Sequence, residues 1–142
     1  MKKFINISNH PSTGWSEEQK RDALHNRDWD VEEIVDFQFP HIDPSMEAEE
    51  INRMAADFLE MLDDGEGLLD PGNIFHMMGE MTFVFDLVRQ LDRMGFPCVA
   101  STTERIVEMA ASGEVKRSHF RFVRFRAYNP QRLRVPGKLL DL

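Results

Sequence analysis

Between residues 74 and 105 the spacing of apolar side chains changes from continuous to helical and back again. A short apolar run covers residues 74–78, an amphipathic segment leads to Gly95, and a second apolar run covers residues 98–100. Continuous apolar runs are typical of buried strands, whereas apolar residues three and four positions apart are typical of a helix with one buried face. The pattern therefore predicts a βαβ unit with parallel strands.

The N-terminal half shows the same alternation of strand and helix. Strands are expected over residues 4–8 and 34–39, because turn residues and proline follow each of them. Ser16 opens a capping-box pattern that predicts a helix over about residues 17–26. A second helix is expected to be capped by Asp43, with an apolar stripe at helical spacing after it.

After the second apolar run, the sequence favours a β-hairpin. Residues 111–113 have turn composition, and residues 119–126 alternate phenylalanine with arginine too regularly for a helix. The alternation slips between Phe122 and Val123, which indicates a bulge or burial on both faces. Residues 129–142 show no period and are interpreted as a loose tail, or as an arm that reaches a partner subunit.

Together these elements predict one α/β domain over residues 1–128, followed by the tail of residues 129–142. The domain is expected to hold a mainly parallel sheet flanked by helices, with a C-terminal β-hairpin. The first and third strands should lie side by side at the centre of the sheet.

The amino-acid composition indicates in which cellular compartment the protein is expected. The single cysteine, Cys98, lies in an apolar run, which suits a packed thiol in a reducing compartment. Without a signal peptide or an apolar window of about 18 residues, the chain is expected to be cytoplasmic and not to enter a membrane. Six methionines are interpreted as core packing: Met54, Met61, Met77, Met78, Met81 and Met94.

The net charge of −8 argues against a general DNA-coating or RNA-coating protein, but it hides a division along the chain. Residues 1–114 carry 9 basic and 24 acidic side chains, whereas residues 115–142 carry 8 basic and 1 acidic. The basic end is either a patch for an anion or a solvated strand edge, and the sequence favours neither.

Polar residues follow three of the predicted strands, at the point where each strand ends. Because the carboxyl ends of parallel strands meet at one edge of a sheet, we expect His10, Glu80 and the hydroxyls near residue 102 to lie in one crevice. The candidate binding residues are Ser8, Asn9, His10, Gly79, Glu80, Met81, Thr82, Ser101, Thr102, Thr103 and Arg105.

These residue types suit an anionic ligand, although each also has a structural interpretation. His10 is either a general acid or base, or a plain surface residue. The helix start at Glu80 is either an anion site or a carboxylate that complements the helix dipole. Arg105 and its neighbouring hydroxyls either hold a phosphate or form a threonine cap and a local ion pair. No zinc-ligand spacing, dinucleotide fingerprint or P-loop is present, so no metal or cofactor is expected.

Four short motifs together resemble small single-domain CRISPR-associated proteins of type III systems, which are related to the CARF domains that bind cyclic oligoadenylate. The resemblance runs from about Phe4 to Tyr128 and excludes the tail. The motifs are Ser-Asn-His-Pro at residues 8–11, Gly-Glu-Met-Thr-Phe at 79–83, Val-Ala-Ser-Thr-Thr-Glu-Arg at 99–105, and Phe-Val-Arg-Phe-Arg-Ala-Tyr at 122–128.

This resemblance implies a Rossmann-like, CARF-like homodimer whose two crevices face each other across a two-fold axis and hold one cyclic oligoadenylate. Several such proteins are ring nucleases, which linearise this second messenger without a metal and so end the antiviral response. The ribose 2′-hydroxyl attacks its own phosphate. His10 would then protonate the leaving oxygen, Glu80 would accept a proton, and Arg105 would hold the phosphate beside the hydroxyls.

The leading hypothesis is therefore a metal-independent ring nuclease, acting most simply on cyclic tetra-adenylate. One alternative is a protein of the same fold that sequesters or senses the ring without cutting it. Another is an interaction protein whose basic hairpin and tail dock onto a larger complex. Because the chain is acidic overall, a polyanionic ring must be bound by local donors and not by a broad basic surface.

Overall fold

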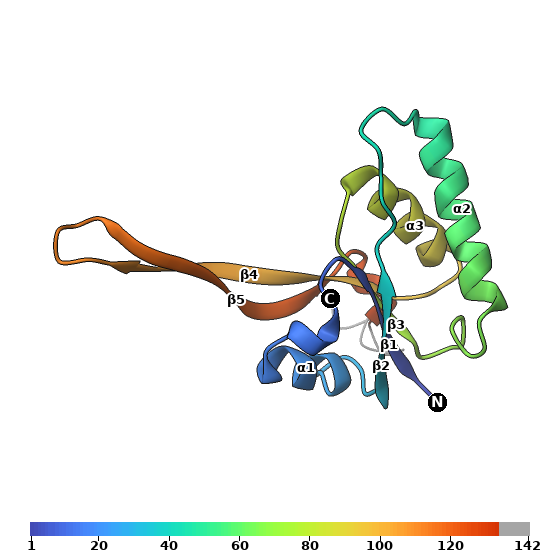
Figure 1. Cartoon of the computed structure of the whole chain (residues 1–142). Helices are drawn as coiled ribbons and strands as arrows, with labels where there is room; N and C mark the ends of the chain where they lie inside the picture. Colours follow the sequence, from blue (N-terminus) through green and yellow to red (C-terminus); the bar gives the residue numbers. More distant parts are fainter. Residues whose placement is uncertain (134–142) are drawn as a thin grey trace.

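The computed structural model describes residues 1–133 and confirms the α/β fold (Figure 1). One five-stranded sheet has the strand order β2-β1-β3-β4-β5, in which the first four strands are parallel and β5 is antiparallel to β4. As expected, the first and third strands pair with each other. The strands are β1 (Lys3–Ser8), β2 (Glu33–Gln38), β3 (Ile74–Met77), β4 (Cys98–Met109) and β5 (Val115–Ala127).

The helices cover the two faces of the sheet unequally. α2 (Ala48–Asp64) and α3 (Met81–Arg93) lie together on one face, and the short α1 (Glu17–Leu24) lies on the other (Figure 1). Each face has its own apolar core, because alternate residues of the central strands point to opposite sides. Ile5 and Phe75 pack toward α2 and α3, whereas Phe4 and Ile74 pack toward α1.

The helix ends show which capping patterns the chain uses. Ser16 caps α1 as expected, its Oγ accepting the backbone N–H of Gln19 at 3.1 Å. Asp43 does not cap α2; its carboxylate instead closes a local turn, and α2 begins five residues later with a capping box that starts at Glu47. Gly95 ends α3 with a φ of +91°, a conformation that favours glycine.

β4 is much longer than its apolar run indicated. The strand continues to Met109, so the residues expected at its end, Ser101 to Arg105, lie inside it. β4 and β5 leave the body as a long two-stranded ribbon (Figure 1), and we call residues 103–122 the arm. Val123 has no partner on β4, because Thr103 pairs with Phe122 while Thr102 pairs with Arg124. The slip in the alternation is therefore confirmed as a β-bulge.

Several burial expectations are corrected. Met77 is fully buried, but Met81 is 82% exposed, and Met61 and Met94 are also exposed. Met81 is the first residue of α3 and does not belong to the apolar core between α2, α3 and the sheet. Cys98 is buried as expected, and burial raises the pKa of its thiol to about 12.

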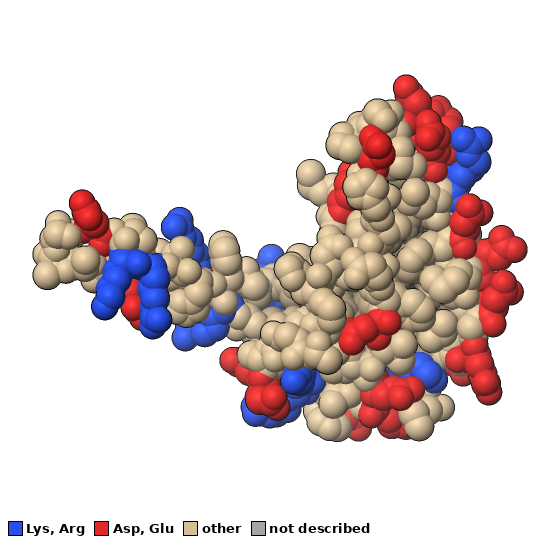
Figure 2. Space-filling view, viewed as in Figure 1, with Lys and Arg blue, Asp and Glu red and all other residues tan. Residues whose placement is uncertain are grey.

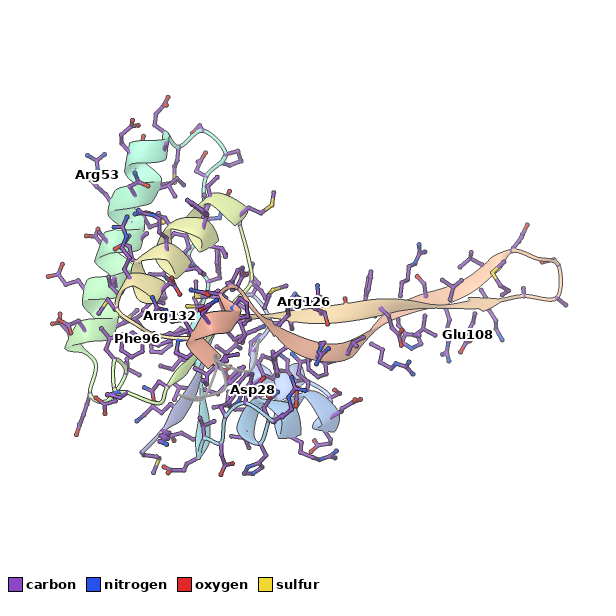
Figure 3. The ribbon with its side chains drawn as sticks, turned by 180° about the vertical axis from the view of Figure 1, so that it is seen from behind. Asp28, Arg53, Phe96, Glu108, Arg126 and Arg132 are labelled. Atoms are coloured by element: carbon purple, nitrogen blue, oxygen red, sulfur yellow. The ribbon has the colours of Figure 1, made fainter. Side chains whose placement is uncertain are left out.

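The start of the tail is packed against the body. Residues 130–133 form a short 3₁₀-helix, η2 (Pro130–Leu133), which is held where Asn129 and Arg132 both bind the carboxylate of Asp92. Figure 3 shows Arg132 against the body from behind. The rest of the predicted tail, residues 134–142, lies outside the described residues. Within residues 1–133, no helix combines the length and the apolar character needed to cross a bilayer.

Candidate functional site

A row of polar side chains, buried at Asn6 and His76 and exposed at Asp36, crosses the face of the sheet that α1 covers. Asp36 on β2, Asn6 on β1 and His76 on β3 are direct register partners, so their side chains emerge side by side. Asn6 is 1% exposed and His76 is 2% exposed. Because buried polar groups are costly without hydrogen bonds, the partners of this row define its chemistry.

Asn6 has a fixed orientation in this row. Its Nδ2 donates to the carboxylate of Asp36 at 2.8 Å and to the backbone carbonyl of His10 at 3.0 Å, and both of these groups only accept. Its Oδ1 therefore faces the opposite way, where it accepts the hydroxyl of Ser8 at 2.8 Å. Asp36 is held in turn by the backbone N–H and hydroxyl of Ser12.

The orientation of Asn6 determines the tautomer of His76. His76 Nδ1 lies 2.8 Å from Asn6 Oδ1, which is an acceptor, so Nδ1 carries the proton. His76 Nε2 lies 3.1 Å from the Oγ of Ser101 on β4. In the neutral ring Nε2 has no proton and accepts the Ser101 hydroxyl.

His76 is neutral throughout the physiological range. Burial, together with the nearby charge of His10, lowers the pKa of His76 to about 3. Aromatic rings enclose it, with Phe4 stacked on it and Trp15 and Phe125 at its edges. The imidazole is therefore a fixed acceptor behind Ser101 and not a group that exchanges protons near neutral pH.

A groove of about 910 Å³ opens beside this network, between the start of α1 and the base of the arm. His10 stands at its edge, exposed, while the backbone carbonyl of the same residue accepts hydrogen bonds from Asn6, Ser8 and the indole of Trp15. The chain at His10 is thus fixed although its ring is free to meet a ligand. The polar lining consists of Ser8, His10, Ser16, Glu18, Gln19, His76, Ser101, Thr103, His119 and Arg121.

The groove brings together four of the residues predicted from the sequence: Ser8, His10, Ser101 and Thr103. Thr102 does not join them, because alternate residues of a strand point to opposite faces. Its hydroxyl donates to the backbone carbonyl of Arg124 at 3.1 Å.

The groove that His10 lines does not include Glu80, which contradicts the expected common crevice. Glu80 is the N-cap of α3 and accepts the backbone N–H groups of Thr82 at 3.1 Å and Phe83 at 2.8 Å, as well as the hydroxyl of Thr82. These hydrogen bonds, of which the one from the Thr82 side chain is the largest cause, lower the pKa of Glu80. The helix N-terminus that was a candidate anion site is occupied by the protein's own carboxylate.

The remaining predicted residues also lie apart from the groove. Gly79 packs against the ring of Phe39 so closely that a Cβ would lie 2.3 Å from it, which explains the glycine. Asn9 lines a separate pocket with Glu80. Arg105 lies within the arm, where it contacts the hydroxyl of Ser118 at 3.5 Å, because β4 continues past the expected strand end.

Sequence reasoning missed the buried half of the site. Asn6, His76 and Asp36 make the network, and none of them was a candidate. A signal was present for two of them, since Asn6 and Ser8 alternate with apolar residues on β1, and His76 is the polar member of an otherwise apolar strand. A polar residue inside a buried strand requires a partner, and that requirement points to a network.

We expect Glu80→Ala to destabilise the protein by about 1 kcal/mol, because the first turn of α3 loses its capping acceptor. Urea unfolding measures the change. Glu80→Gln, which keeps one acceptor oxygen, should lose less. Equal stability of all three proteins would show that the cap contributes nothing.

Within residues 1–133, no group of three or more His, Cys, Asp or Glu side chains is arranged to hold a metal ion.

The chain matches one family of known proteins. Residues 2–126 match the model described as the Uncharacterized protein MJ1673 family. No curated protein and no solved structure matches the chain significantly. Because the match covers most of the sequence, the chain belongs to the MJ1673 family.

Proposed function

We propose that this protein binds a cyclic oligoadenylate in the groove and linearises it without a metal ion. The observation that carries the proposal is the convergence of His10, Ser101 and Thr103, from strands far apart in sequence, on one groove. Its volume of about 910 Å³ is at the upper end of ordinary ligand sites. These residues belong to the motifs on which the resemblance to type III CRISPR-associated proteins rests.

Ser101 offers the groove an acceptor. Its proton is directed at the bare Nε2 of His76, 3.1 Å away, so the lone pairs of Oγ remain for a ligand. A ribose 2′-hydroxyl is a donor that fits this acceptor. Internal attack on the phosphate requires that hydroxyl to be held in line, and the fixed pair of Ser101 and His76 is suited to hold it.

The cleavage step needs one proton to leave and one to arrive. The 2′-oxygen gives its proton to water in the open groove and bonds to phosphorus, the bond from phosphorus to the 5′-oxygen breaks, and the 5′-oxygen takes up a proton. His10 is suited to supply that proton, since it is exposed at the groove and histidine exchanges protons near neutral pH. Thr103 supplies a hydroxyl donor for the phosphate.

The charges around the groove are mixed. Figure 2 shows acidic side chains spread over the body and basic ones along the arm. His119 and Arg121, at the base of the arm, line the groove together with Glu18 of α1, and Arg121 is paired with Glu104. Ser16 at the N-terminus of α1 also lines the groove, and the field of a helix N-terminus attracts anions.

One observation favours the alternative in which the protein binds the ring without cutting it. Of the three residues predicted to act in catalysis, Glu80 is engaged as a cap and Arg105 lies in the arm. Of these three residues, His10 therefore lines the groove of its own chain, and Glu80 and Arg105 do not. A sequestering or sensing protein needs the donors and acceptors of the groove but not a proton donor.

The test is to incubate the purified protein with cyclic tri-, tetra- and hexa-adenylate in the presence of a chelator and to resolve the products. A linear product with a 2′,3′-cyclic phosphate end supports the ring nuclease. Tight binding in calorimetry with no product selects the binding protein. No binding of any ring would reject both, and would favour a protein that acts through contacts with a larger complex.

A further inference from the structure

The arm has two chemically different faces. Residues paired across an antiparallel ladder share a face, so Arg105 with Phe120, Val107 with Ser118, and Met109 with Val115 lie on one side. We call this side, with Val107, Met109, Val115 and Phe120 as its apolar members, the apolar face. The other side carries Glu104, Ile106, Glu108, Arg117, His119 and Arg121, and we call it the charged face.

The charged face is satisfied within the arm. Glu104 binds Arg121, and Glu108 binds Arg117 at 2.7 Å, each across the two strands. Figure 3 shows Glu108 far out on the arm, away from the body, whereas Arg126 lies where β5 meets the body. These cross-strand ion pairs are typical of a surface that remains in water.

The apolar face is left in solvent. Phe120 is 72% exposed, Met109 and Val115 are each 56% exposed, and Val107 is 41% exposed. A two-stranded ribbon is at best marginally stable in water unless it packs on something. Among residues 1–133, the apolar face therefore has no contact that would stabilise the arm.

We infer that the apolar face of the arm binds the apolar face of a second copy, so that two arms stack antiparallel about a two-fold axis near Val107. The patch is self-complementary, as such an interface requires. Antiparallel stacking also brings Arg105, which lies on the apolar face, near the end of the partner's arm that carries Glu114.

The same geometry joins the interface to the groove. Ser101 and Thr103 lie on the same side of β4 as Arg105 and Val107, and Phe120 of the apolar face lines the groove. The groove therefore adjoins the apolar face, although His119 and Arg121 of the charged face also line it. From Thr103 to the tip the arm is roughly 20 Å long. With the axis near Val107, the tip of each arm lies over Thr103 of the other copy and closes the open side of its groove. This part of the inference rests on the proposed function, since it makes the second copy a wall of the ring-binding site.

The experiment compares Phe120→Asp with His119→Asp by light scattering coupled to size exclusion. The two variants add the same residue at adjacent positions of β5, one on each face, and both positions are exposed, so neither should unfold the body. We expect the unmodified protein and His119→Asp to be dimers, and Phe120→Asp to dissociate, with dimer affinity reduced at least about 30-fold. Circular dichroism checks the fold.

Cyclic tetra-adenylate binding separates the two proposals, and it is measured on Val107→Asp, because Phe120 and His119 both line the groove whereas Val107 does not. A monomeric Val107→Asp variant that binds the ring more weakly supports the interface and its closure of the groove. If the unmodified protein is a dimer that Phe120→Asp disrupts, yet it binds no ring, the interface stands and the proposed function falls. A dimer that Phe120→Asp leaves intact, or an unmodified protein that is monomeric, overturns the inference.

Discussion

His10→Ala is expected to slow single-turnover cleavage of cyclic oligoadenylate by about 10²–10⁴-fold while leaving the dissociation constant nearly unchanged. That range is what proton transfer by a positioned side chain typically contributes. The substitution removes the ring alone, because the hydrogen bonds that fix this turn go to the backbone carbonyl and N–H of His10. Cleavage is measured with protein in excess over labelled ring, and affinity by calorimetry.

His25→Ala is the matched control. His25 is also exposed, but it lies at the end of α1, pairs with Asp30, and does not line the groove. Its variant should cleave at the parent rate. If His10→Ala weakens binding and cleavage together, His10 is a phosphate donor. If it cleaves like the parent, His10 is not catalytic, and positioning of the 2′-hydroxyl by Ser101 must suffice.

The sequence predicted the sheet and its helices because each of those elements has a buried face. A buried strand has an apolar run in its sequence, and a helix with one buried face has an apolar stripe. The strands β1 and β3 and the helix α3 all bury one or both sides. The bulge at Val123 was visible for the same reason. Phe122 and Phe125 are both buried but stand three residues apart, which strict alternation does not allow.

The length of β4 was missed because the arm buries little of either face. From Ser101 to Met109 no side chain belongs to a core cluster, so no apolar pattern marks the strand. Hydroxylated and charged residues after an apolar run then have the composition of a strand end. This one error also displaced Arg105, which was expected at the sheet edge and lies in the arm.

Part of the candidate site could be predicted from the sequence and part could not, and the difference has a physical cause. Residues at a strand end, such as His10, are recognisable because the carboxyl edge of a parallel sheet gathers ligand-binding groups. Asn6 and His76 meet only because β1 and β3 pair in a particular register, and a sequence does not show register. The sequence left open whether Glu80 binds a ligand or caps the helix. The backbone N–H groups of Thr82 and Phe83 donate to its carboxylate, which shows that it is the cap.

His76 should make the protein less stable as the pH falls below about 6.5. The unfolded chain takes up a proton at the ordinary pKa of histidine, whereas burial holds the folded pKa at about 3, so between these values the unfolded state binds one more proton. The free energy of unfolding should then fall by about 1.4 kcal/mol per pH unit.

Urea unfolding from pH 6.5 to 5, a range above most carboxylate titrations, measures this change. The free energy of unfolding of the parent should fall more steeply with pH than that of His76→Gln, by about that amount per pH unit. Because His76→Gln also removes a buried, hydrogen-bonded ring, proton NMR of the parent provides a second measurement, in which the His76 ring signals stay constant to pH 4. Parallel unfolding curves, or a His76 signal that titrates near pH 6, would mean that Nε2 is not a fixed acceptor, and the orientation of Ser101 toward it would no longer hold.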